Sequence, residues 1–339
     1  MARPVLINAR AAIRPELGGV ERWARELVAR LPAVAPQRYA VARPPAALAH
    51  RAGHLWEQGV LPLRARDARM LLNPANLAPV AFPRNAVILH DAAPLRHPEW
   101  YSASYVRWQR AVLPVLARRA VHVVTVSEFS RSELVALLGA DPARTSVVPG
   151  GVDDRFTPGA DPEPARRALA LGERPYVLTV GSRIARKNLA ALSVAARRLA
   201  ALGVDLVAAG GGRPQLRAER PTEGVRAVGP VPDAHLPGLY AGARAFVLPS
   251  LYEGFGLPCL EAMASGVPVV AADRAALPET CGDAALLVDP GDPEAIAAAL
   301  ERAVADEPTR RRLVAAGRAR AAPRTWDAAA RAVDAVLAG

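Results

Sequence analysis

Two glutamates, Glu253 and Glu261, lie eight positions apart on either side of a glycine-containing turn. The turn follows an apolar run, residues 245–248, that is expected to be a strand. Gly254 and Gly256 allow the backbone to approach a ligand closely, and the free N–H groups of the helix expected next favour an anion such as a diphosphate. We expect Glu253 on the loop and Glu261 in the first helical turn, where each could accept hydrogen bonds from sugar hydroxyls. An ordinary strand–loop–helix turn with a capping glutamate is the alternative.

A second segment, Gly181 to Asn188, carries two adjacent cations directly after an expected strand, residues 176–180. Arg186 and Lys187 are expected at a helix start, where a glycine turn, positive side chains and free N–H groups suit a phosphate clamp. Lys187 is the single lysine among 43 basic residues. Its retention favours a site that needs a compact point charge, and chance is the alternative. Arg183 is a further cation on this segment.

Glycines and a histidine mark two positions in the first half of the chain. Gly18 and Gly19 precede an expected helix. We interpret them as a loop that lines a ligand cleft, with a plain helix cap as the alternative. His90 and Asp91 end an expected strand, residues 87–89, at the edge where α/β sheets bind ligands. A histidine that only stabilises the fold is the alternative there.

Other chemistries lack their motifs. The sequence has no Gly-x4-Gly-Lys-Ser/Thr loop and no Gly-x-Ser-x-Gly elbow, which argues against a P-loop enzyme and an α/β-hydrolase. Asp153 and Asp154 have no third carboxylate at a metal-like spacing, so we expect no metal. The two cysteines, Cys259 and Cys281, cannot form a disulfide framework. A reducing cytoplasm fits this composition.

Composition narrows the choice of partners. The chain has 339 residues, a hydrophobic fraction of 51% and a net charge of +11, which favours anionic partners such as sugar nucleotides or anionic lipid. Nucleic acid is not expected, because no binding motif appears and aromatics make up 5%. No apolar run reaches the roughly 18 residues of a membrane-spanning helix, and no signal peptide is expected. We expect a cytoplasmic protein whose arginine-rich surface is either simply solvated or in peripheral contact with the inner face of the plasma membrane.

Short apolar runs alternate with longer helical patterns along the whole chain. Apolar strands without alternation are typical of parallel sheets buried on both faces, so the pattern predicts two tandem α/β, Rossmann-like domains. The proline-rich stretch 157–175 is the expected linker, which divides the chain into domains 1–157 and 158–324. Two such domains would face each other across a deep cleft between the carboxyl ends of their sheets. The strands are expected at residues 5–8, 70–72, 87–89, 121–126, 146–148, 176–180, 205–209, 226–228, 245–248, 267–271 and 285–288.

At this level of detail the sequence resembles the retaining glycosyltransferases of the fourth sequence family, which have the GT-B fold. The two-glutamate motif with seven intervening residues carries the resemblance, which covers nearly the whole chain. The other matching segments are Gly18 to Glu21, His90 to Trp100, Val126 to Ser130, Val148 to Asp153, Gly181 to Asn188, Leu248 to Glu253, Gly266 to Val270 and Leu277 to Glu279.

The resemblance implies a role for each candidate residue. Glu261 would bind the ribose hydroxyls, and Arg186 and Lys187 would hold the diphosphate and stabilise its charge as it leaves. His90 would line the donor-sugar pocket. The remaining donor contacts would come from Glu253 with the backbone of Gly254, Phe255, Gly256 and Leu257, from Gly181 and Arg183, from Gly18 and Gly19 near the phosphates or acceptor, and from Val231 beside the base. The last helix, within residues 325–339, would return to the N-terminal domain.

The implied activity is transfer of a hexose, with GDP-mannose as the first candidate donor, to a glycan, lipid-linked or small-molecule acceptor. No cofactor besides the nucleotide sugar and no metal is implied. Two rival functions remain open: a non-catalytic nucleotide-sugar-binding subunit and a sugar-nucleotide epimerase of the same fold. Two departures from the family pattern are Ser182, where many relatives have arginine, and Gly150, where an asparagine is usual.

Overall fold

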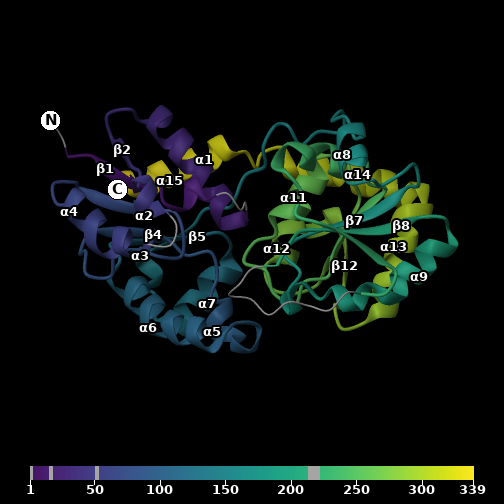
Figure 1. Ribbon diagram of the computed structural model, residues 1–339, viewed down its shortest axis with the longest axis horizontal. Coiled ribbons are helices and arrows are strands. Elements are labelled where there is room, and N and C mark those ends of the chain that lie inside the picture. The colour runs from purple at the N-terminus through teal and green to yellow at the C-terminus, as the bar shows by residue number, and fades with distance from the viewer. Residues whose placement is uncertain (1–2, 15–17, 50–52, 213–221) are drawn as a thin grey trace. The chain divides into compact units, whose positions relative to one another are not determined.

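The structure is a computed structural model that describes residues 3–14, 18–49, 53–212 and 222–339 (Figure 1). The chain divides into two compact units. Unit 1 comprises Met1–Pro98, Ala103–Gly151 and Trp326–Gly339, and unit 2 comprises Glu99–Ser102 and Val152–Thr325. Each unit contains its own sheet with helices packed on it.

The described part of unit 1 has a six-stranded parallel sheet in the order β2-β1-β3-β4-β5-β6. Its inner strands are almost completely buried, which explains their uninterrupted apolar character. The expected strands lie within one or two residues of the observed ones, and the short strand β2 was not predicted. The strands are β1 (Val5–Asn8), β2 (Tyr39–Ala42), β3 (Met70–Asn73), β4 (Asn85–Ile88), β5 (His122–Thr125) and β6 (Thr145–Val147).

Helices flank this sheet, and the longest ones present apolar faces to it. Leu113 and Leu116 of α6 and Leu134 of α7 share a core cluster with Val87 of β4 and Val123 of β5. The run of short helical segments between β2 and β3 was not predicted from the sequence. The helices and turns of unit 1 include η1 (Ala11–Ile13), α1 (Gly19–Val34), α2 (Ala46–Ala49), α3 (Gly53–Leu55), the π-helical turn η2 (Trp56–Val60), α4 (Leu61–Arg64), α5 (Ala93–Arg96), α6 (Ala103–Arg119), α7 (Glu128–Leu138) and η4 (Pro142–Arg144).

The last helix, α15 (Trp326–Ala338), belongs to unit 1, although the stretch Val152–Thr325 separates it from the rest of that unit in sequence. It packs on α1, where the rings of Trp23 and Trp326 meet edge to face with centroids 5.3 Å apart. Asp334 accepts hydrogen bonds from Arg38 (2.6 Å) and from the Tyr39 hydroxyl (2.7 Å). Aromatic packing and these polar contacts together attach α15 to unit 1.

Unit 2 has a second parallel sheet, again six-stranded in the described residues, in the order β12-β11-β10-β7-β8-β9. Sequence order reverses between β7 and β10, which is the topological switch point where open α/β sheets bind ligands. Four of these strands, β7, β8, β10 and β12, have the expected bounds. The strands are β7 (Tyr176–Val180), β8 (Asp205–Ala209), β9 (Val225–Gly229), β10 (Ala245–Leu248), β11 (Val269–Ala272) and β12 (Ala285–Val288).

Several helical segments of unit 2 differ from expectation. Segment 157–175 is not a bare linker: it folds with unit 2 and contains α8 (Glu163–Ala168). Residues 189–202, whose sequence pattern predicts a single helix, begin with the 3-10 turn η6 (Leu189–Leu192) and continue as α9 (Ser193–Ala201). The others are η5 (Ala185–Lys187), η7 (Asp233–His235), α10 (Leu236–Ala241), α11 (Leu257–Ala264), α12 (Leu277–Cys281), η8 (Gly282–Ala284), α13 (Pro293–Ala305) and α14 (Glu307–Ala321).

In the described residues, every helix is too short or too polar to cross a lipid bilayer.

Candidate active site

Two loops meet at the switch point of the unit 2 sheet. One follows β7 and carries Arg186 and Lys187, and the other follows β10 and carries Glu253. The strands are neighbours, with Val177 paired to Ala245, so their carboxyl ends place both loops at the same edge. The main chains are also joined, because the N–H of Leu251 donates to the carbonyl of Arg186 (2.9 Å).

The two cations and Glu253 form one ion cluster. Lys187 Nζ lies 2.6 Å from Glu253 Oε1, and Arg186 Nη1 lies 2.9 Å from Oε2. Arg186 also donates to the carbonyl of Tyr252 (2.5 Å). The cluster has a net charge of +1. It brings together three residues that the sequence analysis assigned to donor binding and catalysis.

The charges of this cluster are held by one another in a largely dry place. Glu253 is 7% exposed and Lys187 is 8% exposed. Burial alone would raise the pKa of Glu253, but Arg186 and Lys187 outweigh it and lower that pKa to about 2. Burial lowers the pKa of Lys187, whereas the charge of Glu253 opposes that shift. Glu253 is therefore a permanent anion at neutral pH, which excludes it as a proton donor.

The turn that carries the cations differs from expectation. Arg186 and Lys187 lie on the 3-10 turn η5 and not at the start of a helix. Asn188 ends this turn in the left-handed region with φ of 55°. Its side-chain amide donates to the carbonyls of Pro249 (3.2 Å) and Pro290 (2.8 Å). Asn188 therefore fixes the turn against the loop after β10.

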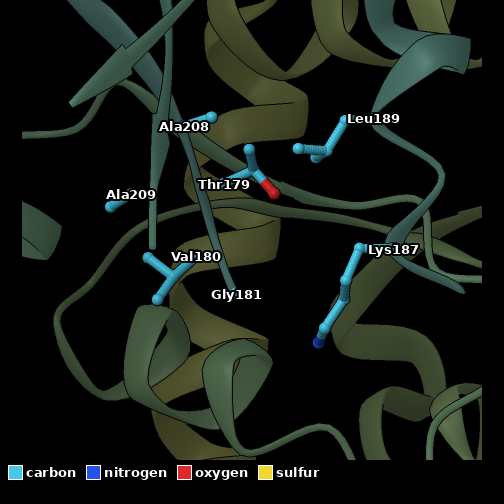
Figure 2. Close-up of a pocket in the computed structure, with 7 residues that line it drawn as sticks. All are labelled: Thr179, Val180, Gly181, Lys187, Leu189, Ala208 and Ala209. Carbon is cyan, nitrogen blue, oxygen red and sulfur yellow. The ribbon is translucent and has the colours of Figure 1, made fainter. Parts of the chain in front are cut away.

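Small residues allow the side chain of Lys187 to pass the end of β7. A Cβ atom at Gly181 would lie 2.8 Å from Lys187 Cε, so the glycine leaves room for the Lys187 side chain in its present position. Figure 2 shows the Lys187 side chain extending past Gly181, beside a small pocket. That pocket is lined by Thr179, Val180, Gly181, Lys187, Leu189, Ala208 and Ala209.

Gly210 supports the same turn and was not identified from the sequence. A Cβ atom there would lie 1.9 Å from the carbonyl oxygen of Gly181, and its φ is +138°. The run Gly210 to Gly212 directly after β8 was the signal that could have indicated a close approach of backbone. The N–H of Arg183, on the loop after β7, donates to the carbonyl of Gly211, on the loop after β8 (3.1 Å). Among the described residues, Arg183 is not an ion-pair partner of Glu253.

The loop after β10 leads into α11 through glycine. Gly256 caps the helix in the left-handed region, with φ of +106°. A Cβ there would lie 2.7 Å from Leu277 Cδ2. Phe255 accepts a hydrogen bond from the Thr280 hydroxyl at its carbonyl (2.5 Å), and Leu257 is the first residue of α11. The backbone from Gly254 to Leu257 is thus held against α12.

Glu261 is on α11, as expected, but it is the fifth residue of the helix, and the first turn contains no acidic residue. Because the helix begins at Leu257, Glu261 lies one residue beyond the first turn, where the carboxylate was expected. Glu261 is 6% exposed and accepts a hydrogen bond at Oε2 from the hydroxyl of Tyr240 (2.9 Å). Sequence reasoning did not identify Tyr240, which lies on another helix.

Val231 lies on the loop between β9 and η7, where it is half-buried. The preceding residue, Pro230, would be 3.0 Å from a Cβ atom at Gly211. The N–H of Gly210 also donates to the carbonyl of Gly229 (2.8 Å). The Val231 loop therefore borders the glycine run that supports the Lys187 turn.

The remaining candidates, Gly18, Gly19 and His90, belong to unit 1. Gly18 is the N-cap of α1, its N–H donates to Glu21 Oε2 (3.1 Å), and Gly19 is the first helical residue. This is the helix cap that was the alternative for the pair. Nearby, Glu21 is also the ion-pair partner of Arg14 (3.4 Å).

His90 is buried beyond the end of β4, and both its backbone and its ring are held by contacts. Its N–H donates to Asn76 Oδ1 (2.7 Å), and its carbonyl accepts from the Ser130 hydroxyl (2.9 Å). The ring nitrogen Nε2 lies 3.3 Å from the carbonyl oxygen of Pro74, and the ring meets Trp23 edge to face (5.8 Å). Burial lowers the pKa of His90, which favours a neutral imidazole at neutral pH.

Over the described ranges, no group of three or more His, Cys, Asp or Glu side chains is placed to hold a metal ion. The ion cluster at the switch point consists of Arg186, Lys187 and the carboxylate of Glu253.

Comparison with known proteins identifies the family. Residues 174–306 match the model described as "Glycosyl transferases group 1", and residues 82–156 match "Glycosyltransferase Family 4". An O-antigen chain mannosyltransferase B of Escherichia coli is 36% identical over 256 residues, which are 72% of this chain and 67% of that protein. The chain belongs to the family 4 glycosyltransferases.

Other relatives of this glycosyltransferase are matched over less of their length. An MMP alpha-(1->4)-mannosyltransferase of Mycolicibacterium hassiacum is 32% identical, over 66% of this chain and 53% of the relative. A D-inositol 3-phosphate glycosyltransferase of Salinispora arenicola is 34% identical, over 61% of this chain and 52% of the relative. The chain thus spans about half the length of these two proteins.

Solved structures show that this glycosyltransferase has the predicted GT-B fold. Sucrose-phosphate synthase of Thermosynechococcus elongatus superposes with a TM-score of 0.76 at 22% identity, covering 99% of this chain and 98% of the other. Anabaena HepE in complex with UDP-glucose gives a TM-score of 0.75 at 18% identity, covering 99% of each chain. The fold of the whole glycosyltransferase is therefore shared, while sequence identity is low.

Proposed function

We propose that this glycosyltransferase transfers a hexose from a nucleoside-diphosphate sugar with retention of configuration at C1, without a metal. The observation that carries the proposal is the pairing of Arg186 and Lys187 at the switch point, beside the glycine loop that leads to Glu261. This arrangement offers fixed positive charge where a diphosphate would bind. Glu261 then binds the ribose, and the backbone from Gly254 to Leu257 holds the donor sugar.

The proposed chemical step breaks the bond between C1 and the diphosphate oxygen, and the electron pair goes to the leaving phosphate. Lys187 and Arg186 stabilise that growing negative charge. The acceptor hydroxyl attacks C1 from the same face, and its proton passes to an oxygen of the leaving phosphate. Glu253 as a covalent nucleophile, by analogy with retaining glycosidases, is less favoured because two cations hold both of its oxygens.

Mannose is the first candidate sugar, with GDP-mannose as donor. Two relatives are named as mannosyltransferases, one of them for the O-antigen chain, which supports a glycan or lipid-linked acceptor. Relatives named for inositol 3-phosphate support a small-molecule acceptor instead. The experiment must therefore distinguish a glycan or lipid-linked acceptor from a small-molecule acceptor.

The test begins with thermal-shift measurements of the full chain against GDP-mannose, UDP-glucose and dTDP-rhamnose. A ligand at 100 times its dissociation constant adds about 2.7 kcal/mol of stability, which such an assay detects. The donor that stabilises is then incubated with acceptor candidates, and the product anomer is read by NMR. We expect retention, and turnover that continues in EDTA. An inverted anomer, or a complete loss in EDTA that a metal restores, contradicts the proposal.

A further inference from the structure

Tyr240 and Glu261 form a buried hydrogen bond between two helices of unit 2. The hydroxyl of Tyr240 on α10 donates to Glu261 Oε2 on α11 over 2.9 Å. Tyr240 is completely buried and Glu261 is 6% exposed. A buried bond to a carboxylate is worth more than one between neutral groups, so this contact limits the orientations open to the Glu261 carboxylate.

The ring of Tyr240 is itself fixed by its neighbours. Phe156 meets it nearly edge to face, with centroids 5.6 Å apart, and Phe246 of β10 lies at the same distance on a tilted plane. The backbone of α10, which carries Tyr240, packs tightly as well. A Cβ atom at Gly238 would lie 2.2 Å from the carbonyl oxygen of Asp161. The hydroxyl therefore points at Glu261 from a rigid support.

An ionised carboxylate offers about four acceptor directions, so the bond from Tyr240 is compatible with further hydroxyl donors. A carboxylate that could turn would keep one good bond to a ribose that lacks its 2′-hydroxyl. A carboxylate held at a fixed angle cannot turn to compensate for the missing 2′-hydroxyl. Sites built to bond a hydroxyl reject analogues without it, because the partner group is left unpaired.

We infer that Tyr240 is a positioning residue that makes this site select ribonucleoside over 2′-deoxyribonucleoside diphosphates. The inference rests on the proposed function, in which Glu261 binds the ribose. It deepens that proposal by naming the donor class: sugars carried on a ribonucleotide such as GDP or UDP are substrates, and sugars carried on a deoxyribonucleotide such as dTDP are poor ones.

The experiment measures dissociation constants by calorimetry on the full chain, with the pairs GDP and 2′-deoxy-GDP, and UDP and 2′-deoxy-UDP. For the base that binds, we expect the wild type to prefer the ribonucleotide by roughly ten- to a hundredfold, the scale of one bond to a charged group. In Tyr240→Phe the ring packing is kept. We expect the preference to fall to about threefold or less, because the released carboxylate can turn and bind the deoxyribonucleotide better.

Tyr176→Phe is the matched control. Tyr176 is also buried in unit 2, and its hydroxyl donates to the carbonyl of Leu239 (2.7 Å), next to Tyr240 in the chain. This variant loses a buried hydroxyl bond to the same helix without touching Glu261, so it should keep the ribose preference. Glu261→Asp provides a second measurement, because it keeps the charge but withdraws it from Tyr240, and it should also lose the preference.

The outcomes separate this inference from the function on which it rests. Equal weakening of both nucleotides in Tyr240→Phe and Glu261→Asp, with the preference intact, would show a merely structural role and overturn the inference. Loss of the preference in Tyr176→Phe as well would also overturn it. If Glu261→Ala binds ribonucleotide as tightly as the wild type, the ribose assignment in the proposed function is itself wrong.

Discussion

At the scale of single residues, the central feature is one carboxylate shared by two cations. Glu253 holds Lys187 and Arg186 at 2.6 and 2.9 Å, and burial makes these interactions stronger than they would be in water. In the proposed function, the diphosphate of the donor would share both cations, because it carries more negative charge than the carboxylate. The cations would then be in position before the donor arrives, which would limit reorganisation during the reaction.

The first prediction concerns Lys187, and it depends on the proposed leaving-group role. Lys187→Ala should lower kcat about a hundred- to thousandfold, the scale of a removed oxyanion donor, with a smaller effect on donor binding. The reason is that charge on the diphosphate grows only as the glycosidic bond breaks. Steady-state kinetics with a confirmed donor and acceptor provide the measurement.

Two further variants sharpen this test. Lys187→Arg should be partly active, because a planar fork replaces a point charge. The double variant of Arg186 and Lys187 to alanine should be less than additive, since both cations touch the same carboxylate. A Lys187→Ala enzyme with raised donor KM and normal kcat would show that Lys187 only binds the donor.

The second prediction concerns pH. The folded-state pKa of Glu253 is about 2 against an ordinary value of 4.5, so its stabilisation is fully present above about pH 4.5 and is lost as pH falls toward 2. Between about pH 6 and about pH 3 this loss is on the order of 2 kcal/mol. Denaturant unfolding should show that Glu253→Gln lacks this part of the acid destabilisation. The exposed Glu223→Gln should retain it, and an identical pH slope in both variants would contradict the assignment.

At the scale of elements, the sequence predicts strand bounds best where the apolar pattern alone determines them. Strands β7, β8, β10 and β12 have the expected bounds, because an apolar run between polar or glycine residues is typical of a strand buried in a parallel sheet. Strand β2, Tyr39–Ala42 at the sheet edge, was missed, since two of its four residues are alanine, which is depleted in strands.

The structure brings together Arg186, Lys187 and Glu253, three of the residues that the sequence proposes for the site, but the local structure around them was not predicted. The motif spacing indicated Glu253, Glu261, Arg186 and Lys187. It could not indicate the 3-10 turn η5, because Asn188 stabilises that turn through carbonyls 61 and 102 positions away. The bond from Tyr240 to Glu261 likewise depends on how two helices pack, which no local pattern contains.

The third prediction tests whether the glycine after β8 shapes the Lys187 turn. Gly210→Ala should displace the Gly181 backbone, because the added Cβ would lie 1.9 Å from its carbonyl oxygen. We expect a loss of roughly 1–3 kcal/mol in stability, the scale of a strained backbone position, together with reduced turnover. Gly212→Ala is the control, since nothing lies within 4 Å of its Cβ position. Equal melting temperatures for the two variants would refute the close approach.

At the scale of the whole molecule, the chain builds unit 1 from both of its ends. Helix α15 lies on α1 through Trp326 and Trp23, and Trp23 in turn contacts the ring of His90. Unit 2 is one nearly continuous stretch, Val152–Thr325, with its own core. A destabilising substitution in α15 should therefore first lower the stability of unit 1, although most of that unit is distant in sequence.

The fourth prediction uses this connection. Trp326 is 1% exposed, so Trp326→Ala should destabilise the protein by about 3–5 kcal/mol, as for other buried tryptophans. In hydrogen–deuterium exchange, peptides from β1, α1 and β2 should exchange faster, while those from β7, β8 and β10 keep their protection. Arg331→Ala, an exposed position on the same helix, should leave all these peptides unchanged. Faster exchange spread equally over both sheets would mean that the two units unfold as one, and α15 would then stabilise the entire chain rather than unit 1.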